Sequence, residues 1–351
     1  MLFRSDNFKD SSNEFLNKRI LITGASSGIG YACAIYFLNC GAKVILCGRD
    51  LDTLIKIGEK YPNQVIVVNI DLTHDLQVFD LKTTVVENLQ GIDIIVNAAG
   101  ILFDGDLEKT FPQDYDYTFD VNMRSVFIIC TNLKPFLSQG SSIINVSCLY
   151  GSKPQTGCLS YCMSKAGLET LTRCIAAEYA KDGIRVNCVS AAPVDTNCQR
   201  YVGVSENEYN SFKERVSKNN PLQRMAKPSD VAKAVIFLAS QRSSKVTGQI
   251  IKVDGGRSLT TAGYVPWRGI KNMNARFEPD GVNNNVKVKD LWGKVVKSNE
   301  TFPENEEDIQ RLIKESNWST NLSDAHDKVF AQYNYIDSND KYLMENYVKK
   351  K

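Results

Sequence analysis

Tyr161 and Lys165 are the residues of this sequence whose types and spacing point most directly to chemistry. Side chains four residues apart share one face of a helix, and an ammonium beside a phenol favours the phenolate. A free phenol has a pKa of about 10, and lowering it to about 7 takes roughly 4 kcal/mol of differential stabilisation. The pair therefore predicts a tyrosine that donates or accepts a proton near neutral pH.

The spacing of this pair is not specific by itself. It recurs in the pairs Tyr209/Lys213 and Tyr347/Lys351. The first pair follows a glycine-rich turn and a short Asn-Ala-Ala-Gly motif at distances that one fold can bring together. Those two motifs decide how the first pair is interpreted.

The glycine-rich turn, residues 23–30, reads Thr-Gly-Ala-Ser-Ser-Gly-Ile-Gly and joins an apolar run to a helical stretch. Gly24, Gly28 and Gly30 let the backbone turn tightly and approach a pyrophosphate, whose charge the first N–H groups of the helix can hold. The turn predicts a dinucleotide-binding site.

The residue at the end of the second predicted strand distinguishes between the two nicotinamide cofactors. An acidic residue at this point would pair with a ribose diol, whereas the planar guanidinium of Arg49 suits a 2′-phosphate. We therefore expect NADPH, with NADH as the alternative if Arg49 is only a solvated surface residue beside Asp50. Asp71 follows the third predicted strand and either accepts from the adenine amino group or caps a helix.

Composition excludes several classes of function. The 42 basic and 40 acidic residues leave a net charge of +2, which argues against nucleic acid or an anionic membrane as partner. The first 18 residues are polar, and no apolar run approaches the roughly 20 residues of a membrane span, so we expect a cytoplasmic protein. Ten cysteines without a Cys-x-x-Cys motif predict reduced, mostly buried thiols, and two histidines, His74 and His326, argue against a metal site or a histidine triad.

The elements that must position these motifs alternate along the chain. Short β-branched runs predict strands buried on both faces, and apolar residues at helical spacing predict helices between them. The strands are expected at 20–22, 44–46, 65–68, 92–96, 143–146, 185–189 and 249–253, and the helices at 30–40, 76–88, 114–137, 160–181 and 228–240. This order predicts an α/β fold, a doubly wound parallel sheet of about seven strands of the Rossmann type.

The texture of the sequence changes near its two ends. We expect a polar N-terminal segment at 1–17, one domain carrying the cofactor and substrate sites at 18–258, and a C-terminal extension at 259–351. Within that extension, residues 304–315 and 321–333 are candidates for short helices, but no strand rhythm is present.

Taken together, the motifs resemble the short-chain dehydrogenase/reductase family, in its single-domain form, and especially animal proteins labelled 3-oxoacyl-carrier-protein reductase-like. The resemblance covers about residues 17–257. The residues that carry it are 23–30, Asp71, 97–100, Asn122, 145–151, Tyr161, Lys165, 185–187, Thr196 and 253–257.

The resemblance implies an oxidoreductase that transfers hydride between NADPH and a small-molecule carbonyl or alcohol. Tyr161 would be the acid/base, Lys165 would lower its pKa, and Asn122 would hold a proton-relaying water unless it is only a satisfied helix residue. Homo-oligomers, dimers or tetramers, are common in the family. The residues implied in cofactor binding are Gly24, Ser26, Ser27, Gly28, Ile29, Gly30, Arg49, Asp71, Leu72, Asn97, Ala98, Gly100, Tyr161, Lys165 and Thr196.

The sequence departs from the family at two places. Cys148 stands where the family has a substrate-binding serine, and a thiol is the weaker donor. Its neighbour Ser147 cannot simply substitute, because adjacent side chains of an extended segment face opposite ways, and the sequence leaves open which of the two fills the serine role. Ala191 and Ala192 replace the family's Pro-Gly beside the nicotinamide. These changes keep a second hypothesis open, that of a non-catalytic dinucleotide-binding scaffold or sensor.

Overall fold

The computed structural model describes residues 13–103, 105, 107–108, 110–196, 205–260, 288–289 and 295–296. The chain divides into two compact units, Met1–Phe277 and Glu278–Lys351. The first unit holds a parallel sheet covered by helices on both faces, which confirms the predicted α/β fold.

Seven strands form the parallel sheet among the described residues, in the order β3-β2-β1-β4-β5-β6-β7. The central strands β1, β2 and β4 are apolar and mostly buried, because both of their faces pack against helices. The strands are β1 (Arg19–Thr23), β2 (Lys43–Gly48), β3 (Val65–Asn69), β4 (Ile92–Asn97), β5 (Leu137–Cys148), β6 (Arg185–Ala191) and β7 (Ile250–Val253).

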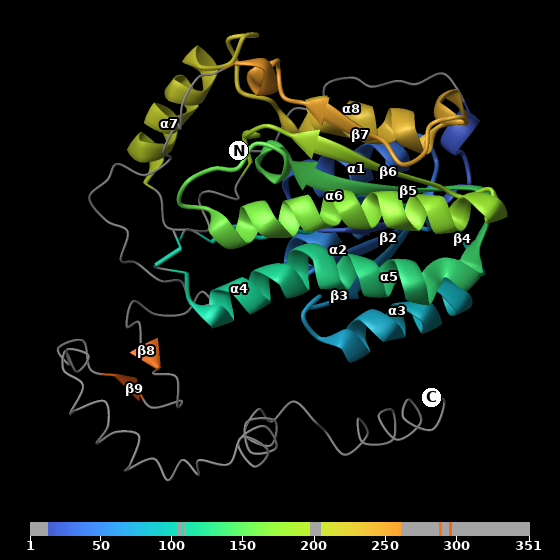
Figure 1. Ribbon diagram of the computed structural model, residues 1–351. Coiled ribbons are helices and arrows are strands. Elements are labelled where there is room, and N and C mark those ends of the chain that lie inside the picture. Colours follow the sequence, from blue (N-terminus) through green and yellow to red (C-terminus); the bar gives the residue numbers. More distant parts are fainter. Residues whose placement is uncertain are drawn as a thin grey trace. The chain divides into compact units, whose positions relative to one another are not determined.

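Two apolar clusters lie on opposite faces of this sheet. One contains side chains of α1, α2 and α8, and the other contains side chains of α3, α5 and α6. The ribbon in Figure 1 shows α1 and α8 on one face of the sheet and α3 and α5 on the other. The helices are α1 (Gly28–Asn39), α2 (Leu51–Lys60), α3 (Asp75–Asn88), α4 (Pro112–Phe119), α5 (Ser125–Leu133), α6 (Leu159–Tyr179), α7 (Glu206–Lys218) and α8 (Pro228–Ala239).

The prediction of one helix over residues 114–137 is wrong in detail. A π-helical turn, Asp120–Arg124, separates α4 from α5 and carries Asn122. The helical stretch ends before residue 137, because Pro135 follows α5 in a short 3-10 turn and β5 begins at Leu137. The helices α2 and α7 were not anticipated.

The sheet has its switch point between β1 and β4. The chain leaves β1 toward β2 on one side and later returns to β4 on the other. Thr23 pairs with Asn97, so the glycine turn after β1 and the motif after β4 emerge side by side. Ligands of doubly wound sheets bind in the crevice at this point, outside the carboxyl ends of the strands.

The cysteines and the second unit were also subjects of sequence-based expectations. Nine cysteines of the described part are free thiols and most of them are buried. The same part shows no group of three metal-binding side chains, and it has no helix both long and apolar enough to cross a membrane. In the second unit, two short strands that the sequence did not suggest, β8 (Val288–Lys289) and β9 (Val295–Val296), pair antiparallel. The helices expected at 304–315 and 321–333 lie outside the described residues.

Candidate functional site

The glycine turn closes in a way that larger residues would prevent. Gly24 has φ +65°, and a Cβ on it would lie 2.8 Å from Cα of Ala99. A Cβ on Gly30 would lie 2.2 Å from the carbonyl oxygen of Gly24. The turn therefore packs directly against the chain that follows β4.

The start of α1 is suited to an anion. Ser27 is its N-cap residue and makes no side-chain capping bond, and the first turn carries no acidic residue. The positive end of the helix dipole and its first N–H groups are therefore not offset by a carboxylate. Ser26 and Ile29, also expected to contact the cofactor, are partly exposed beside this turn, and the Ser26 hydroxyl lies 3.3 Å from where a Cβ on Gly48 would be. These features fit a dinucleotide pyrophosphate.

Arg49 is exposed at the end of β2, and its neighbour is already engaged. The Asp50 carboxylate caps α2, accepting from the N–H of Thr53 at 3.1 Å and from its hydroxyl at 2.7 Å. Arg49 Nη1 donates instead to the hydroxyl of Tyr117 on α4, at 2.9 Å. The guanidinium thus lies at the tip of the strand without an acidic partner in Asp50.

Asp71 and Leu72 follow β3. Oδ1 of Asp71 accepts from the N–H and the hydroxyl of Thr73, at 2.9 and 2.8 Å, and this fixes the local turn. The helix cap considered for Asp71 is wrong, since His74 occupies the N-cap of α3. Leu72 is buried in the cluster beneath α3. Contact of either residue with adenine stays a prediction.

Asn97 lies inside the sheet at the end of β4. Its Nδ2 donates to Oδ1 of Asn145 on β5 at 2.8 Å, which links the two central strands. Ala98 and Gly100 continue from it, and a Cβ on Gly100 would lie 3.3 Å from both Asn122 Oδ1 and Lys165 Nζ. Gly100 therefore leaves room between these two side chains.

Asn122 is completely buried and ties three segments together. Its Nδ2 donates to the carbonyl oxygen of Ile101 and to the hydroxyl of Ser164, both at 3.0 Å. The N–H of Ile101 donates back to Oδ1 at 2.9 Å. The π-helical turn therefore anchors the chain after β4 to α6, one residue from Lys165.

Lys165 places its ammonium beneath Tyr161. The side chain is 4% exposed, and Nζ donates to the carbonyl oxygen of Val146 on β5 at 3.0 Å. Nζ lies 5.7 Å from the ring centroid of Tyr161, which is itself partly exposed. A buried cation thus sits below a partly exposed phenol.

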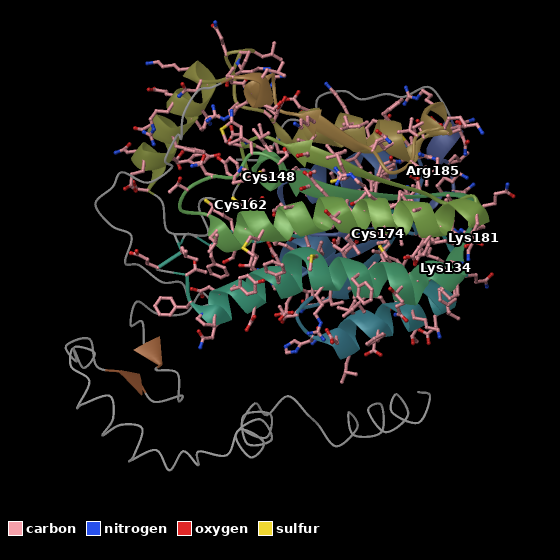
Figure 2. All side chains as sticks on the ribbon, in the orientation of Figure 1. Lys134, Cys148, Cys162, Cys174, Lys181 and Arg185 are labelled. Carbon is pink, nitrogen blue, oxygen red and sulfur yellow. The ribbon has the colours of Figure 1, made fainter. Side chains whose placement is uncertain are left out.

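Cys148 ends β5 beside the same tyrosine. Burial raises the pKa of its thiol to about 11, although hydrogen bonds from the backbone of Tyr150 and the side chain of Tyr161 act in the opposite direction. The thiol is therefore protonated at neutral pH and can donate a hydrogen bond. Figure 2 shows Cys148 near one end of α6, with Lys181 and Arg185 near the other.

Ser147 faces away from this site, as its position in an extended strand predicts. Its hydroxyl donates to Glu169 Oε1 at 3.1 Å and to the carbonyl oxygen of Lys165 at 3.3 Å, on the interior side of α6. The structure thus brings Asn122, Cys148, Tyr161 and Lys165 together and leaves Ser147 out.

The chain after β4 also packs against α7, a helix that sequence reasoning missed. Leu102, after β4, packs against an apolar cluster of α7 and the chain before α8. The cluster consists of Tyr209, Phe212, Val216 and Met225. The helical spacing of its first three members and the Ser205/Glu208 capping box were the signals that could have predicted α7.

The chain after β6 passes over the glycine turn. Ala191 packs in the core cluster of α1 and α8, and Ala192 is buried with its N–H bonded to the carbonyl of Val253 at 3.2 Å. Thr196 follows, and its Cγ2 would be 3.1 Å from a Cβ on Gly28. Thr196 therefore lies directly against the turn, and its contact with a cofactor stays a prediction.

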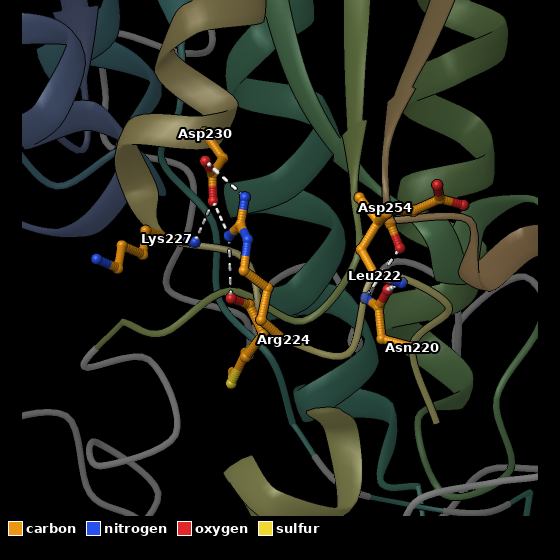
Figure 3. A network of polar contacts seen from close by, with 7 residues as sticks. Asn220, Leu222, Arg224, Lys227, Asp230 and Asp254 are labelled. Carbon is orange, nitrogen blue, oxygen red and sulfur yellow. Dashed lines mark hydrogen bonds and ion pairs between the residues drawn. The ribbon is translucent and has the colours of Figure 1, made fainter. Parts of the chain in front are cut away.

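Polar contacts fix the chain between α7 and α8 (Figure 3). Asn220 Nδ2 donates to the carbonyl of Asp254 at 3.1 Å, and its Oδ1 accepts from the N–H of Leu222 at 3.0 Å. Arg224 forms a two-pronged ion pair with Asp230 in the first turn of α8, at 2.6 and 3.1 Å. The C-terminal end of α7 is therefore held to the turn after β7.

Comparison with known proteins agrees with this geometry. Residues 24–258 match the family model described as enoyl-(acyl carrier protein) reductase. The chain is 36% identical over 244 residues to 3-oxoacyl-(acyl-carrier-protein) reductase FabG of Thermotoga maritima, covering 68% of this chain and 97% of that protein. It is 34% identical over 252 residues to 2,3-dihydro-2,3-dihydroxybenzoate dehydrogenase of Escherichia coli, covering 70% and 99%.

Solved structures show the same likeness. A short-chain dehydrogenase/reductase of unknown function from Caenorhabditis elegans, solved with cofactor, has a TM-score of 0.66 at 30% identity, over 70% of this chain and 97% of that one. The 3-ketoacyl-(acyl-carrier-protein) reductase of Brucella melitensis, complexed with NADH, has a TM-score of 0.63 at 27% identity, over 70% and 99%.

Proposed function

The chain belongs to the short-chain dehydrogenase/reductase family, and from that premise we propose that it transfers hydride between NADPH and a carbonyl or alcohol, with Tyr161 as acid/base. Its relatives are reductases and dehydrogenases, so it is an oxidoreductase that acts on CH–OH or carbonyl groups. What is proposed beyond this is the cofactor, the residues and the kind of substrate.

One observation carries the proposal: Tyr161 hydrogen-bonds the Cys148 thiol while the buried Lys165 ammonium lies beneath its ring. The cofactor, when bound, supplies or accepts the hydride at its nicotinamide. Reduction leaves negative charge on the substrate oxygen, so an acid must stand beside that oxygen. Tyr161 is partly exposed at the crevice, and a nearby cation favours loss of its proton.

The neighbouring residues divide the remaining tasks. The protonated Cys148 thiol donates a hydrogen bond toward the same substrate oxygen. Asn122 holds the chain after β4 against α6 through Ile101 and Ser164, and so fixes the wall opposite Lys165. The relay of protons through a water at Asn122 remains part of the proposal, although its side-chain amide already donates to Ile101 and Ser164.

Two observations support the choice of NADPH. Arg49 presents a guanidinium at the tip of β2, where a carboxylate would favour a ribose diol. The adjacent Asp50 is committed to capping α2 and to Thr53. A 2′-phosphate would find a donor and no facing carboxylate from Asp50.

The substrate we propose is small or medium and apolar. Leu102 is partly exposed and packs on the buried apolar cluster of α7 and its C-terminal flank, so its surroundings carry no charge. We further propose a cytoplasmic homo-oligomer, a dimer or a tetramer, as is common for this family.

The test is Tyr161→Phe, which removes the phenol oxygen and keeps the ring. We expect turnover of ketones to fall by at least 100-fold, the usual contribution of general acid catalysis, while NADPH still binds. The matched control is Tyr179→Phe on the same helix. The Tyr179 hydroxyl donates to the carbonyl of Cys130 at 3.0 Å, near the end of α6 remote from Tyr161. The Tyr179→Phe variant should therefore turn over ketones as the wild type does.

The outcomes of this test separate the two hypotheses. A Tyr161→Phe variant that keeps full turnover would remove Tyr161 from the mechanism. A wild-type protein that binds NADPH and reduces no ketone of a broad panel would favour the non-catalytic binder, which the weak donor at Cys148 and the residues Ala191 and Ala192 motivate.

A further inference from the structure

A second tyrosine and lysine with the spacing of Tyr161 and Lys165 converge on one carboxylate. Tyr209 and Lys213 lie on α7, and both face Asp195, which follows β6. The Tyr209 hydroxyl donates to Oδ1 of Asp195 at 2.7 Å, and Lys213 Nζ contacts Oδ2 at 2.9 Å. Lys213 Nζ also lies 5.5 Å from the centroid of the Tyr209 ring. The three side chains form a compact cluster, named here the α7 latch.

The α7 latch includes a buried hydroxyl. Tyr209 is 1% exposed, so its hydroxyl must find partners within the protein, and Asp195 and the carbonyl of Thr196 provide them. Hydrogen bonds to an ionised acceptor are roughly twice as strong as neutral ones. The half-exposed ion pair with Lys213 adds a smaller contribution, because solvent screens it.

The α7 latch lies next in sequence to Thr196, which contacts the glycine turn. Thr196 is adjacent to Asp195, and its Cγ2 lies 3.1 Å from the Cβ position of Gly28. The backbone on the other side is fixed as well, because the N–H of Asp195 donates to the carbonyl of Ala226 at 2.8 Å. The position of Thr196 over the turn is therefore set by α7 and the chain before α8.

The far end of α7 is equally held. The backbone carbonyl of Asn219, its C-cap residue, accepts from Arg257 Nη1 at 3.0 Å. Asn220 Nδ2 donates to the carbonyl of Asp254 at 3.1 Å. Both partners lie in the turn after β7. The helix α7 is thus held at both ends, so its contacts with Asp195 can fix the position of Thr196.

We propose that Tyr209 and Lys213 are positioning residues for the cofactor, which act through Asp195 to hold Thr196 against the glycine turn. This inference rests on the proposed function, since it assigns them to the binding of NADPH. Tyr209 and Lys213 have the same spacing as Tyr161 and Lys165. Because the α7 pair contacts the carboxylate of Asp195, we assign it to cofactor binding.

The test measures binding directly by titrating NADPH fluorescence, so it needs no turnover. The variants are Tyr209→Phe, which deletes the hydroxyl, and Lys213→Met, which deletes the ammonium. We expect NADPH affinity to fall about tenfold for Tyr209→Phe, the effect of one charge-assisted hydrogen bond, and about threefold for Lys213→Met. Lys213→Arg should restore wild-type affinity. Lys218→Met, which removes an exposed charge from the same helix, is the matched control and should bind as wild type.

A second ligand separates positioning from general loss of structure. The compound 2′,5′-ADP keeps the adenosine with its 2′- and 5′-phosphates. It lacks the second phosphate of the NADPH pyrophosphate, the nicotinamide ribose and the nicotinamide, so it does not extend to Thr196. Its affinity, measured by calorimetry, should be unchanged in both variants. Equal losses for NADPH and 2′,5′-ADP would show a merely structural role and overturn the inference, and so would undiminished NADPH binding by both variants.

Failure of the proposed function gives a different result. A wild-type protein that binds neither ligand overturns the NADPH assignment, and the positioning role with it. A wild-type protein that binds NADPH as tightly as its latch variants overturns only the positioning role. If Tyr209→Phe does not fold, Lys213→Met and Lys213→Arg decide the question, because Lys213 is half-exposed.

Discussion

Replacing Cys148 by serine should make this enzyme faster. The thiol occupies the position where the family places a hydroxyl, and it is in place already, since the side chain of Tyr161 hydrogen-bonds it. Serine keeps the size and direction of the side chain and substitutes a stronger donor. The expected change is in turnover, with cofactor affinity unaltered.

The size of the effect follows from the state of the thiol. Burial raises the pKa of Cys148 to about 11, so the thiol keeps its proton at pH 7. The proton needed for donation is therefore always present, and only the strength of the bond differs. A neutral hydrogen bond contributes about 1 kcal/mol, so we expect kcat to rise about fivefold in Cys148→Ser. Deleting the donor in Cys148→Ala should lower it about tenfold or more.

The assay is steady-state consumption of NADPH with the best ketone of a panel, at saturating cofactor, over pH 6 to 9. The ratio of Cys148→Ser to wild type should be constant over this range, because burial holds the pKa of the thiol near 11. Cys162→Ser is the control, since that thiol contacts the backbone of Gln155. A Cys148→Ser protein slower than wild type, with intact NADPH binding, would refute the assignment of Cys148 as donor.

Two further predictions concern the cofactor and the pH dependence of stability. Replacing Arg49 by leucine should raise KM for NADPH about 10- to 100-fold and leave KM for NADH within about twofold. Steady-state kinetics with each cofactor measures both values, and a rise of both together would contradict the prediction. Burial raises the pKa of Asp93, but hydrogen bonds from Arg19 outweigh burial and hold that pKa below its ordinary value. The pair therefore stabilises the fold above about pH 4, and this contribution is lost as the pH falls through the folded-state pKa. Asp93→Asn should cost about 1 kcal/mol in urea unfolding at pH 7 and close to nothing at pH 2, and an equal cost at both would disprove the linkage.

The sheet and the residues at its carboxyl edge could be predicted because local sequence determines both. Runs such as that of β1 are apolar at successive positions, which requires burial on both faces and hence a parallel sheet. The opposite directions of Ser147 and Cys148 follow from the pleat alone, and the contact of Ser147 with Glu169 confirms them.

The π-helical turn around Asn122 could not be predicted, because its cause is distant in sequence. Residues 114–137 have a helical pattern throughout, and no glycine or proline marks the change before Pro135. The side chain of Asn122 bonds Ile101 and Ser164, which lie 21 and 42 residues away. Those partners are brought to it by the sheet, so the irregular turn becomes favourable only in the folded molecule.

The pair Tyr209 and Lys213 shows where the limit of sequence reasoning lies. Spacing determines that a tyrosine and a lysine share a helical face, and nothing more. The pair on α6 meets Cys148 and the carbonyl of Val146 at the end of β5, whereas the pair on α7 meets Asp195 after β6. The phenol of Tyr161 lies above a buried ammonium and is partly exposed, whereas the buried phenol of Tyr209 donates its hydrogen bond to a carboxylate. The chemistry of each pair is therefore decided by the strand end that it faces, which is a property of the topology.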